Sequence, residues 1–110
     1  FQALRMEVND ELGGLDRGLR AAMRSLVPGG RLSVITFESV THRHTKAFFR
    51  STARDYDLQG EVDSPEFRTA RLPLGRMEPR RAIQPGAEEV AANPRCRSAQ
   101  LRVLEKLSHA

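Results

Sequence analysis

An amphipathic helix pattern, a Pro-Gly-Gly turn and a short apolar run follow one another over residues 1–37. Apolar side chains recur three and four positions apart in the first segment, at Leu12, Leu15, Leu19, Ala22, Met23 and Leu26. Pro28 to Gly30 then ends the helix and turns the chain. The run from Leu32 to Phe37 is typical of a strand that is buried on both faces. Helix, turn and buried strand in this order predict an αβ unit of a doubly wound sheet.

Shorter patterns predict the elements on either side of that strand. Asn9 is a candidate N-cap that would divide the first helix into a short leading piece and a main one. Glu38 to Thr41 is expected to form a loop, and a helix is expected from His42 to Arg54, with Phe48 and Phe49 in the core. The polar stretch from Asp55 to Arg71 predicts a loop without regular structure.

The last third of the chain predicts short elements and one terminal strand. Pro73 and Pro79 limit any strand between Leu72 and Ile83 to an edge or to short pieces. Residues 85–93 suit a short helical turn that Pro94 ends. Residues 100–107 predict a strand that carries Leu101, Val103, Glu105 and Leu107 on an apolar face and Arg102, Leu104 and Lys106 on a polar one.

Composition sets the broad class of the protein. A chain of 110 residues forms one small domain, and 39% hydrophobic with 29% charged residues is typical of soluble globular proteins. No apolar run is long enough to cross a bilayer, which predicts no membrane association. The single cysteine, Cys96, excludes an internal disulfide and fits a reducing cytoplasm, and it lacks partners at metal-ligand spacing, so no metal is expected. Because Phe1 falls at once into a helical pattern, we expect the chain to be part of a longer one.

The excess positive charge comes from arginine. The net charge is +4, and sixteen arginines accompany only two lysines. Arginine suits phosphate because its planar fork donates two parallel hydrogen bonds. A basic balance of this kind is compatible with a nucleic acid partner, although many basic proteins bind none.

Three blocks of sequence together resemble one methyltransferase family. They are Phe1 to Leu12, Pro28 to Ser39, and Asn93 to Arg102, the last of which reads Asn-Pro-Arg-Cys-Arg-Ser-Ala-Gln-Leu-Arg. In this order they resemble the C-terminal part of the bacterial MraW family, whose members use S-adenosylmethionine to methylate the exocyclic N4 amine of a cytosine in 16S ribosomal RNA. After the strand, Phe37, Ser39 and Arg43 match the family pattern, whereas Glu38 and the pair Thr41 and His42 depart from it.

The resemblance implies a fold for this chain and a cofactor site outside it. It implies that residues 1–110 are a single partial domain, the C-terminal portion of a class I methyltransferase Rossmann-like α/β sheet with flanking helices. Residues 32–37, part of 74–83, and 100–107 would be its fifth, sixth and seventh strands, lying side by side in the order five, seven, six. The S-adenosylmethionine site would lie in the missing N-terminal half, so this chain alone would bind no cofactor and would be inactive.

Six residues are candidates for contact with substrate or RNA, while the identity of the catalytic residues stays open. Arg43, Glu38 and Ser39 lie just beyond the carboxyl end of the expected strand, where ligands bind in open α/β sheets. Arg95, Arg97 and Ser98 precede the terminal strand, where guanidinium groups can meet phosphates. Ser39 could equally cap a helix, and the three residues before the terminal strand could equally bond within the fold.

His42 and His44 stand two positions apart at a predicted helix start, so they point in different directions and are expected to be solvated. The resemblance implies a cytoplasmic protein whose partner is 16S rRNA or the small ribosomal subunit. Two other functions remain open: a non-catalytic basic RNA-binding module, and a class I methyltransferase that acts on a protein or a small molecule.

Overall fold

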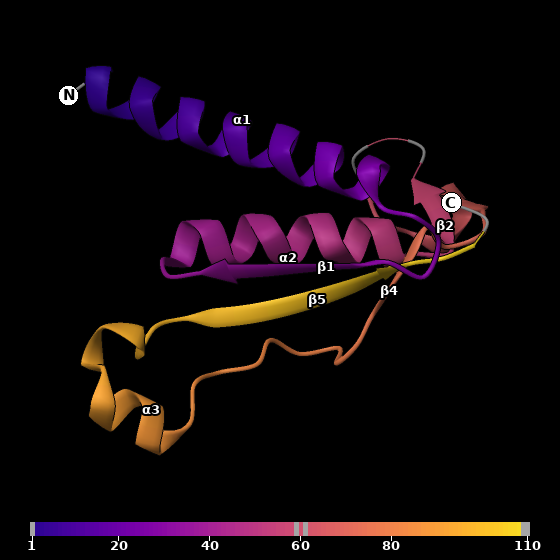
Figure 1. Ribbon diagram of the computed structural model, residues 1–110. Coiled ribbons are helices and arrows are strands. Elements are labelled where there is room, and N and C mark those ends of the chain that lie inside the picture. Colours follow the sequence, from indigo (N-terminus) through magenta and orange to yellow (C-terminus); the bar gives the residue numbers. More distant parts are fainter. Residues whose placement is uncertain (1, 59, 61, 109–110) are drawn as a thin grey trace.

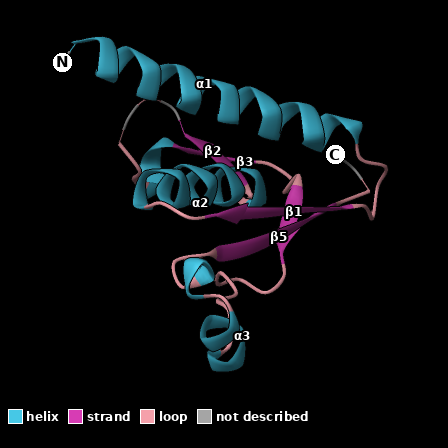
Figure 2. Cartoon of the chain, turned by 60° about the vertical axis from the view of Figure 1, so that its left-hand side comes forward, coloured by secondary structure: helices cyan, strands magenta, loops and turns pink. Residues whose placement is uncertain are grey.

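Two helices stack on one face of a three-stranded sheet (Figure 1). The computed structural model describes residues 2–58, 60 and 62–108, with side chains from residue 10 onward. The helices are α1 (Gln2–Ser25) and α2 (Ser39–Ala53). The sheet contains β1 (Arg31–Thr36), β4 (Gly75–Met77) and β5 (Gln100–Lys106). Viewed from a second direction, α2 again lies between α1 and the sheet (Figure 2).

The strands of this sheet are ordered β1-β5-β4, and β5 is antiparallel to both neighbours. Ile35 pairs with Leu101 and Leu32 with Leu104, while Met77 pairs with Leu104 from the other side. The three segments expected to be neighbours therefore pair in the predicted order, with the last one in the middle. The chain is a mixed α/β structure in which all strand pairings are antiparallel within the described residues.

The core lies between the helices and the sheet. Leu19, Met23, Phe49 and Leu104 are its buried side chains, and Phe48 packs against them. The predicted helix stripe and the predicted core phenylalanines are thus confirmed. Burial of a side chain as large as Phe49 contributes about 1.5–3 kcal/mol relative to an exposed position.

Two expectations about α1 and β1 were wrong. The helix α1 continues through Asn9, so this residue caps no separate main helix. Strand β1 is covered on one face only, and Ile35 on the other face is 58% exposed, because both long helices lie on the same side of the sheet. The turn between α1 and β1 forms as predicted. Gly29 has a φ of 85° there, a conformation that disfavours residues with a Cβ.

The faces of the terminal strand are the reverse of the prediction. Leu104 has 0% exposure and packs in the core, so the face it shares with Arg102 and Lys106 points toward the helices. The two cations are tolerated there because their long side chains reach past the apolar layer. Lys106 does so by donating from Nζ to the carbonyl oxygen of Leu26 at 2.9 Å, at the C-terminal end of α1.

The segment from Asp55 to Arg71 contains regular structure where a loop was predicted. Strands β2 (Tyr56–Leu58) and β3 (Arg68–Ala70) form an antiparallel hairpin, with the short 3-10 helix η1 (Pro65–Phe67) directly before β3. Strands of three residues are too short to show a recognisable alternation of apolar and polar residues in the sequence. Side-chain contacts hold the hairpin instead, because Arg68 stacks 4.2 Å from the centre of the Tyr56 ring and binds Asp63 at 2.8 Å.

The C-terminal third forms as short pieces. Three elements match the predictions: the edge strand β4, the short helix α3 (Ala87–Ala92), and β5, the last strand in the sequence. A second 3-10 helix, η2 (Pro94–Cys96), was not predicted. Among the described residues, no helix combines the length and apolar character needed to cross a membrane.

Candidate functional site

The carboxyl end of β1 leads directly into α2. The helix begins at Ser39, three residues earlier than predicted, because Glu38 occupies the N-cap position with an extended backbone. Its carbonyl oxygen accepts hydrogen bonds from the His42 amide at 2.8 Å and from the Thr41 hydroxyl at 3.0 Å. Ser39 is therefore the first helical residue and not the cap, which leaves its hydroxyl exposed for other partners.

His42 joins this helix start to the segment that precedes β5. Its Nδ1 lies 2.5 Å from the hydroxyl oxygen of Thr36, the last residue of β1. Its Nε2 lies 3.1 Å from the carbonyl oxygen of Ser98. A carbonyl oxygen can only accept, so Nε2 carries a proton and donates it. In the neutral imidazole Nδ1 is then the acceptor, and the Thr36 hydroxyl donates to it.

This pair of bonds corrects the view of His42 as a solvated histidine. The ring is half-buried, and Thr36 beneath it is only 6% exposed. His44, by contrast, forms an ion-pair contact with Asp16 of α1 at 3.0 Å, at a partly exposed position. The sequence does place His42 six positions after Thr36, the hydroxyl residue that ends β1. It gives no sign of the second partner, Ser98, which lies 56 positions away.

The segment before β5 is ordered by its own backbone. Asn93 caps η2 by accepting the amide proton of Arg95 on Oδ1 at 3.3 Å. The amide of Arg97 donates to the Pro94 carbonyl oxygen at 3.2 Å. Arg95 and Arg97 are exposed, and neither guanidinium has a hydrogen-bond or ion-pair partner among the described residues. The backbone thus fixes the segment and leaves both cations free for an anion.

The six candidates lie at one end of the molecule (Figure 1), where β1 ends, α2 begins and η2 precedes β5. Only Ser98 is tied to the α2 start by a hydrogen bond, and the bond uses its carbonyl group and not its hydroxyl. Glu38 and Arg43 are exposed, with side chains that pair with no other described residue. The arrangement therefore offers one carboxylate, two hydroxyls and three unpaired guanidinium groups to a ligand.

No group of three or more His, Cys, Asp or Glu side chains gathers at metal-binding spacing in the part of the chain that the structure describes. The Pro28 to Gly30 turn does not fit S-adenosylmethionine either. The amide of Gly29 donates to the Lys106 carbonyl at 2.7 Å and that of Gly30 to the Val27 carbonyl at 2.8 Å. These two amides are used within the fold and are not available to a ligand.

Comparison with known proteins gives the family. A model of the MraW methylase family matches residues 1–107, almost the whole chain. The chain belongs to the MraW methylase family. The resemblance noted in the three sequence blocks is thereby confirmed.

Similar curated proteins carry the name Ribosomal RNA small subunit methyltransferase H. The one from Dinoroseobacter shibae is 51% identical over 109 residues, covering 94% of this chain and 30% of the relative. Those from Cupriavidus metallidurans and Acidothermus cellulolyticus are each 48% identical, covering 97% of this chain and 33% and 32% of the relative. This MraW-family chain thus spans about a third of the length of the relatives it matches.

Proposed function

We propose that this chain is the C-terminal part of an S-adenosylmethionine-dependent methyltransferase that modifies the N4 amine of a cytosine in 16S ribosomal RNA. Membership of the MraW family and the names of the relatives support the reaction class and the substrate. The observation that carries the proposal is the His42 bridge. It holds residues 36–43, in which Phe37, Ser39 and Arg43 match the family pattern, beside residues 93–102 at one end of the sheet.

The chemistry asks for positioning more than for a strong acid or base. The cytosine amine would bond to the methyl carbon as the carbon–sulfur bond of S-adenosylmethionine breaks and S-adenosylhomocysteine leaves, and the amine would then lose a proton. In this proposal the exposed Glu38 carboxylate and Ser39 hydroxyl bond the amine and orient a base that has left the RNA stack. In the same proposal Arg43, Arg95 and Arg97 hold neighbouring phosphates, a role that fixes the register of the RNA.

The fold proposal follows the same family. Strands β1, β5 and β4 correspond to the fifth, seventh and sixth strands of a class I methyltransferase sheet, and residues 1–110 form one part of that domain. Preceding residues of the complete protein continue the sheet along the other edge of β1 and supply the cofactor site. The chain alone is therefore inactive, and the complete protein works in the cytoplasm, with the small ribosomal subunit as its partner.

Titration calorimetry with S-adenosylmethionine tests this division. We expect binding to the complete protein and none to the 110-residue chain, followed by methyl transfer from the complete protein to small ribosomal subunits. Sequencing of the product RNA would locate the methyl group, with N4-methylcytosine expected. Binding by neither form would contradict the proposal and would favour a non-catalytic basic RNA-binding module. Transfer to protein or to small molecules without RNA would contradict the substrate.

A further inference from the structure

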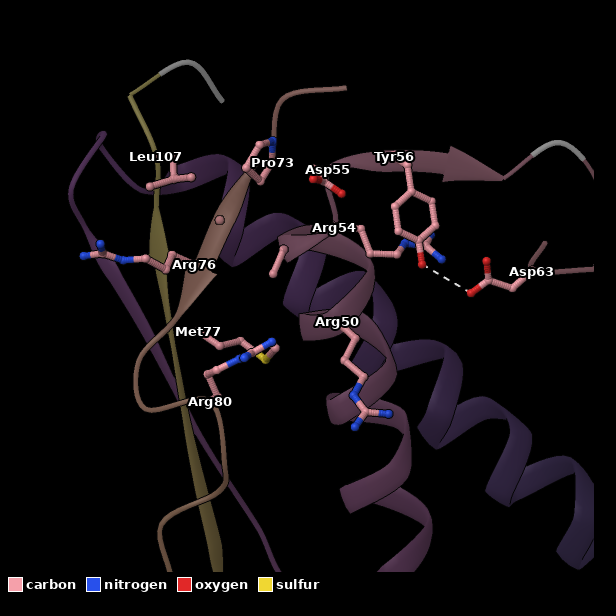
Figure 3. A pocket seen from close by; sticks show the side chains of 12 residues that line it. Arg50, Arg54, Asp55, Tyr56, Asp63, Pro73, Arg76, Met77, Arg80 and Leu107 are labelled. Atoms are coloured by element: carbon pink, nitrogen blue, oxygen red, sulfur yellow. Dashed lines mark hydrogen bonds between the residues drawn. The ribbon is translucent and has the colours of Figure 1, made fainter. Parts of the chain in front are cut away.

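A polar hollow lies at the end of α2 opposite the candidate site. Its volume is about 950 Å3, and it is bounded by the last turn of α2, the hairpin and β4 (Figure 3). Four arginines line it, namely Arg50, Arg54, Arg76 and Arg80, together with the carboxylates of Asp55 and Asp63. Lining of this kind favours a charged ligand over an apolar one.

The charges in the hollow are not balanced. Arg76 points away from it and binds Glu78 at 3.1 Å and Glu105 at 3.0 Å. Asp63 is engaged by Arg68 and accepts a hydrogen bond from the Tyr56 hydroxyl at 3.2 Å. Its negative charge is therefore already neutralised.

Two guanidinium groups remain without partners. The side chain of Arg80 extends from the segment after β4 toward α2, and that of Arg50 lies along α2 (Figure 3). Neither makes a hydrogen bond or ion pair with any described residue. Arg54 lies beside them, stacked 5.2 Å from the centre of the Tyr56 ring. Of the carboxylates that line the hollow, only that of Asp55 has no engaged partner among the described residues. The hollow therefore keeps an excess of positive charge.

The charge of Arg50 also acts on a fifth arginine, Arg102, which does not line the hollow. Burial lowers the pKa of Arg102, and the positive charge of Arg50 lowers it further. No carboxylate is bound to either group among the described residues, and Arg102 bonds only the amide oxygen of Gln100. An anion near Arg50 would relieve the repulsion between the two cations.

A row of cations along one side of α2 runs from the candidate site to the hollow. Arg43, Lys46, Arg50 and Arg54 are separated by three, four and four positions, a spacing that places all four on the same side of a helix. At about 1.5 Å per residue, Arg43 and Arg54 are about 16 Å apart along the axis. Stacked nucleotides rise about 3.4 Å each, so one RNA segment of about five nucleotides spans that distance.

We propose that Arg50 and Arg80, with Arg54 beside them, bind backbone phosphates of the same RNA whose base enters the site at the start of α2. This inference rests on the proposed function and adds a second, distant anchor to it. The ligand class is the sugar-phosphate backbone, because unpaired planar guanidinium groups suit phosphate oxygens. The hollow supplies register and affinity without reading the base sequence.

The test compares two double variants of the complete protein. Arg50→Gln with Arg80→Gln removes the proposed phosphate-binding groups, whereas Arg17→Gln with Arg20→Gln removes two exposed charges on α1 and serves as the matched control. We expect the first pair to weaken binding of small-subunit RNA by about 10-fold to 100-fold. The slope of log K against log salt concentration should also fall by about 1.4, or about 0.7 for each phosphate that is no longer bound. The control pair should leave both the RNA affinity and the salt slope unchanged.

Further arms separate the possible outcomes. Arg50→Lys with Arg80→Lys should keep the salt slope and restore part of the affinity, and this pair answers the question if the glutamine pair unfolds. Equal RNA affinity and salt slope in the wild type and in the Arg50 and Arg80 variants would overturn the inference. Methyl transfer by the wild type would in that case still support the proposed function. Binding of inorganic phosphate that depends on these arginines, with an unchanged RNA salt slope, would assign the hollow to a small phosphate compound and would also overturn it. Absence of RNA methylation by the wild type would instead count against the proposed function.

Discussion

His42 determines at the residue scale how the candidate site is held together. Substitution His42→Ala would leave the Thr36 hydroxyl, which is 6% exposed, without its partner, and would release the Ser98 carbonyl. We expect a loss of about 1–3 kcal/mol in the free energy of unfolding, the cost of an unsatisfied buried polar group. Urea unfolding of the complete protein measures it, and RNA methylation should fall in parallel.

The neighbouring histidine supplies the control for this prediction. His44→Ala removes a partly exposed contact with Asp16, so its cost should stay below about 1 kcal/mol. A double-mutant cycle of His42→Ala with Thr36→Val should give a coupling of about 0.5–3 kcal/mol. Equal losses from the two histidine variants, or zero coupling, would show that the bridge does not hold the site.

At the scale of single elements, β4 depends on a glycine that fits against the core. A Cβ at Gly75 would stand 3.0 Å from Leu104 Cδ1 and 3.1 Å from the Glu105 carbonyl oxygen. We expect Gly75→Ala to cost about 1–3 kcal/mol, because the fully buried Leu104 has little room to move. Gly86→Ala is the control, since no atom lies within 4 Å of the added methyl group. Thermal unfolding that ranks the two variants equally would contradict the close packing of β4.

The β2–β3 hairpin should respond to acid. The hydrogen bond from Arg68 lowers the pKa of Asp63, and the charge of Arg68 and the Tyr56 hydroxyl act in the same direction. A carboxyl group whose pKa is lower in the folded state stabilises that state above its unfolded pKa. The contribution disappears as pH falls through the folded value. We therefore expect the hairpin to weaken below about pH 4, and Asp63→Asn to remove this dependence.

Carbon-detected NMR of the Asp63 carboxyl group measures the titration directly. Arg68→Gln should move the midpoint upward, because it removes the largest cause of the lowered pKa. A midpoint that does not move would show that Arg68 does not bind Asp63 in solution.

The elements differ in how far the sequence could predict them. The α1 stripe and the Phe49 core position depend on local periodicity, and both were predicted correctly. The hairpin was not, since it depends on the stacking of Arg68 on Tyr56 and not on a pattern of apolar residues. The prediction assigned the two faces of β5 the wrong way round. The alternation of apolar and polar residues does not show that Lys106 bonds the Leu26 carbonyl, 80 positions away. Of the site, the candidate segments were predictable, but the bond that joins them was not, because Ser98 contributes a backbone carbonyl that any residue could supply.

At the scale of the whole molecule, β1 has one free edge within the described residues, because β5 alone pairs with it. The amide and carbonyl of Leu101 both bond to Ile83, at 2.9 and 2.7 Å, and so point away from β1. In an antiparallel pair the partner of such a residue also turns its backbone groups outward. Ile35 is that partner, and Ser33 shares its orientation because alternate residues face the same edge.

These two amides indicate whether the sheet continues in the complete protein. In the 110-residue chain, amide hydrogen exchange at Ser33 and Ile35 should be fast, whereas Val34, which faces β5, should be protected. In the complete protein a preceding strand of the proposed class I sheet would pair with this edge, so all three amides should be protected. Val34 serves as the internal control for folding of β1. Fast exchange at Ser33 and Ile35 in the complete protein, with Val34 protected, would mean that no strand adds there, and β1 could not be the fifth strand of such a sheet.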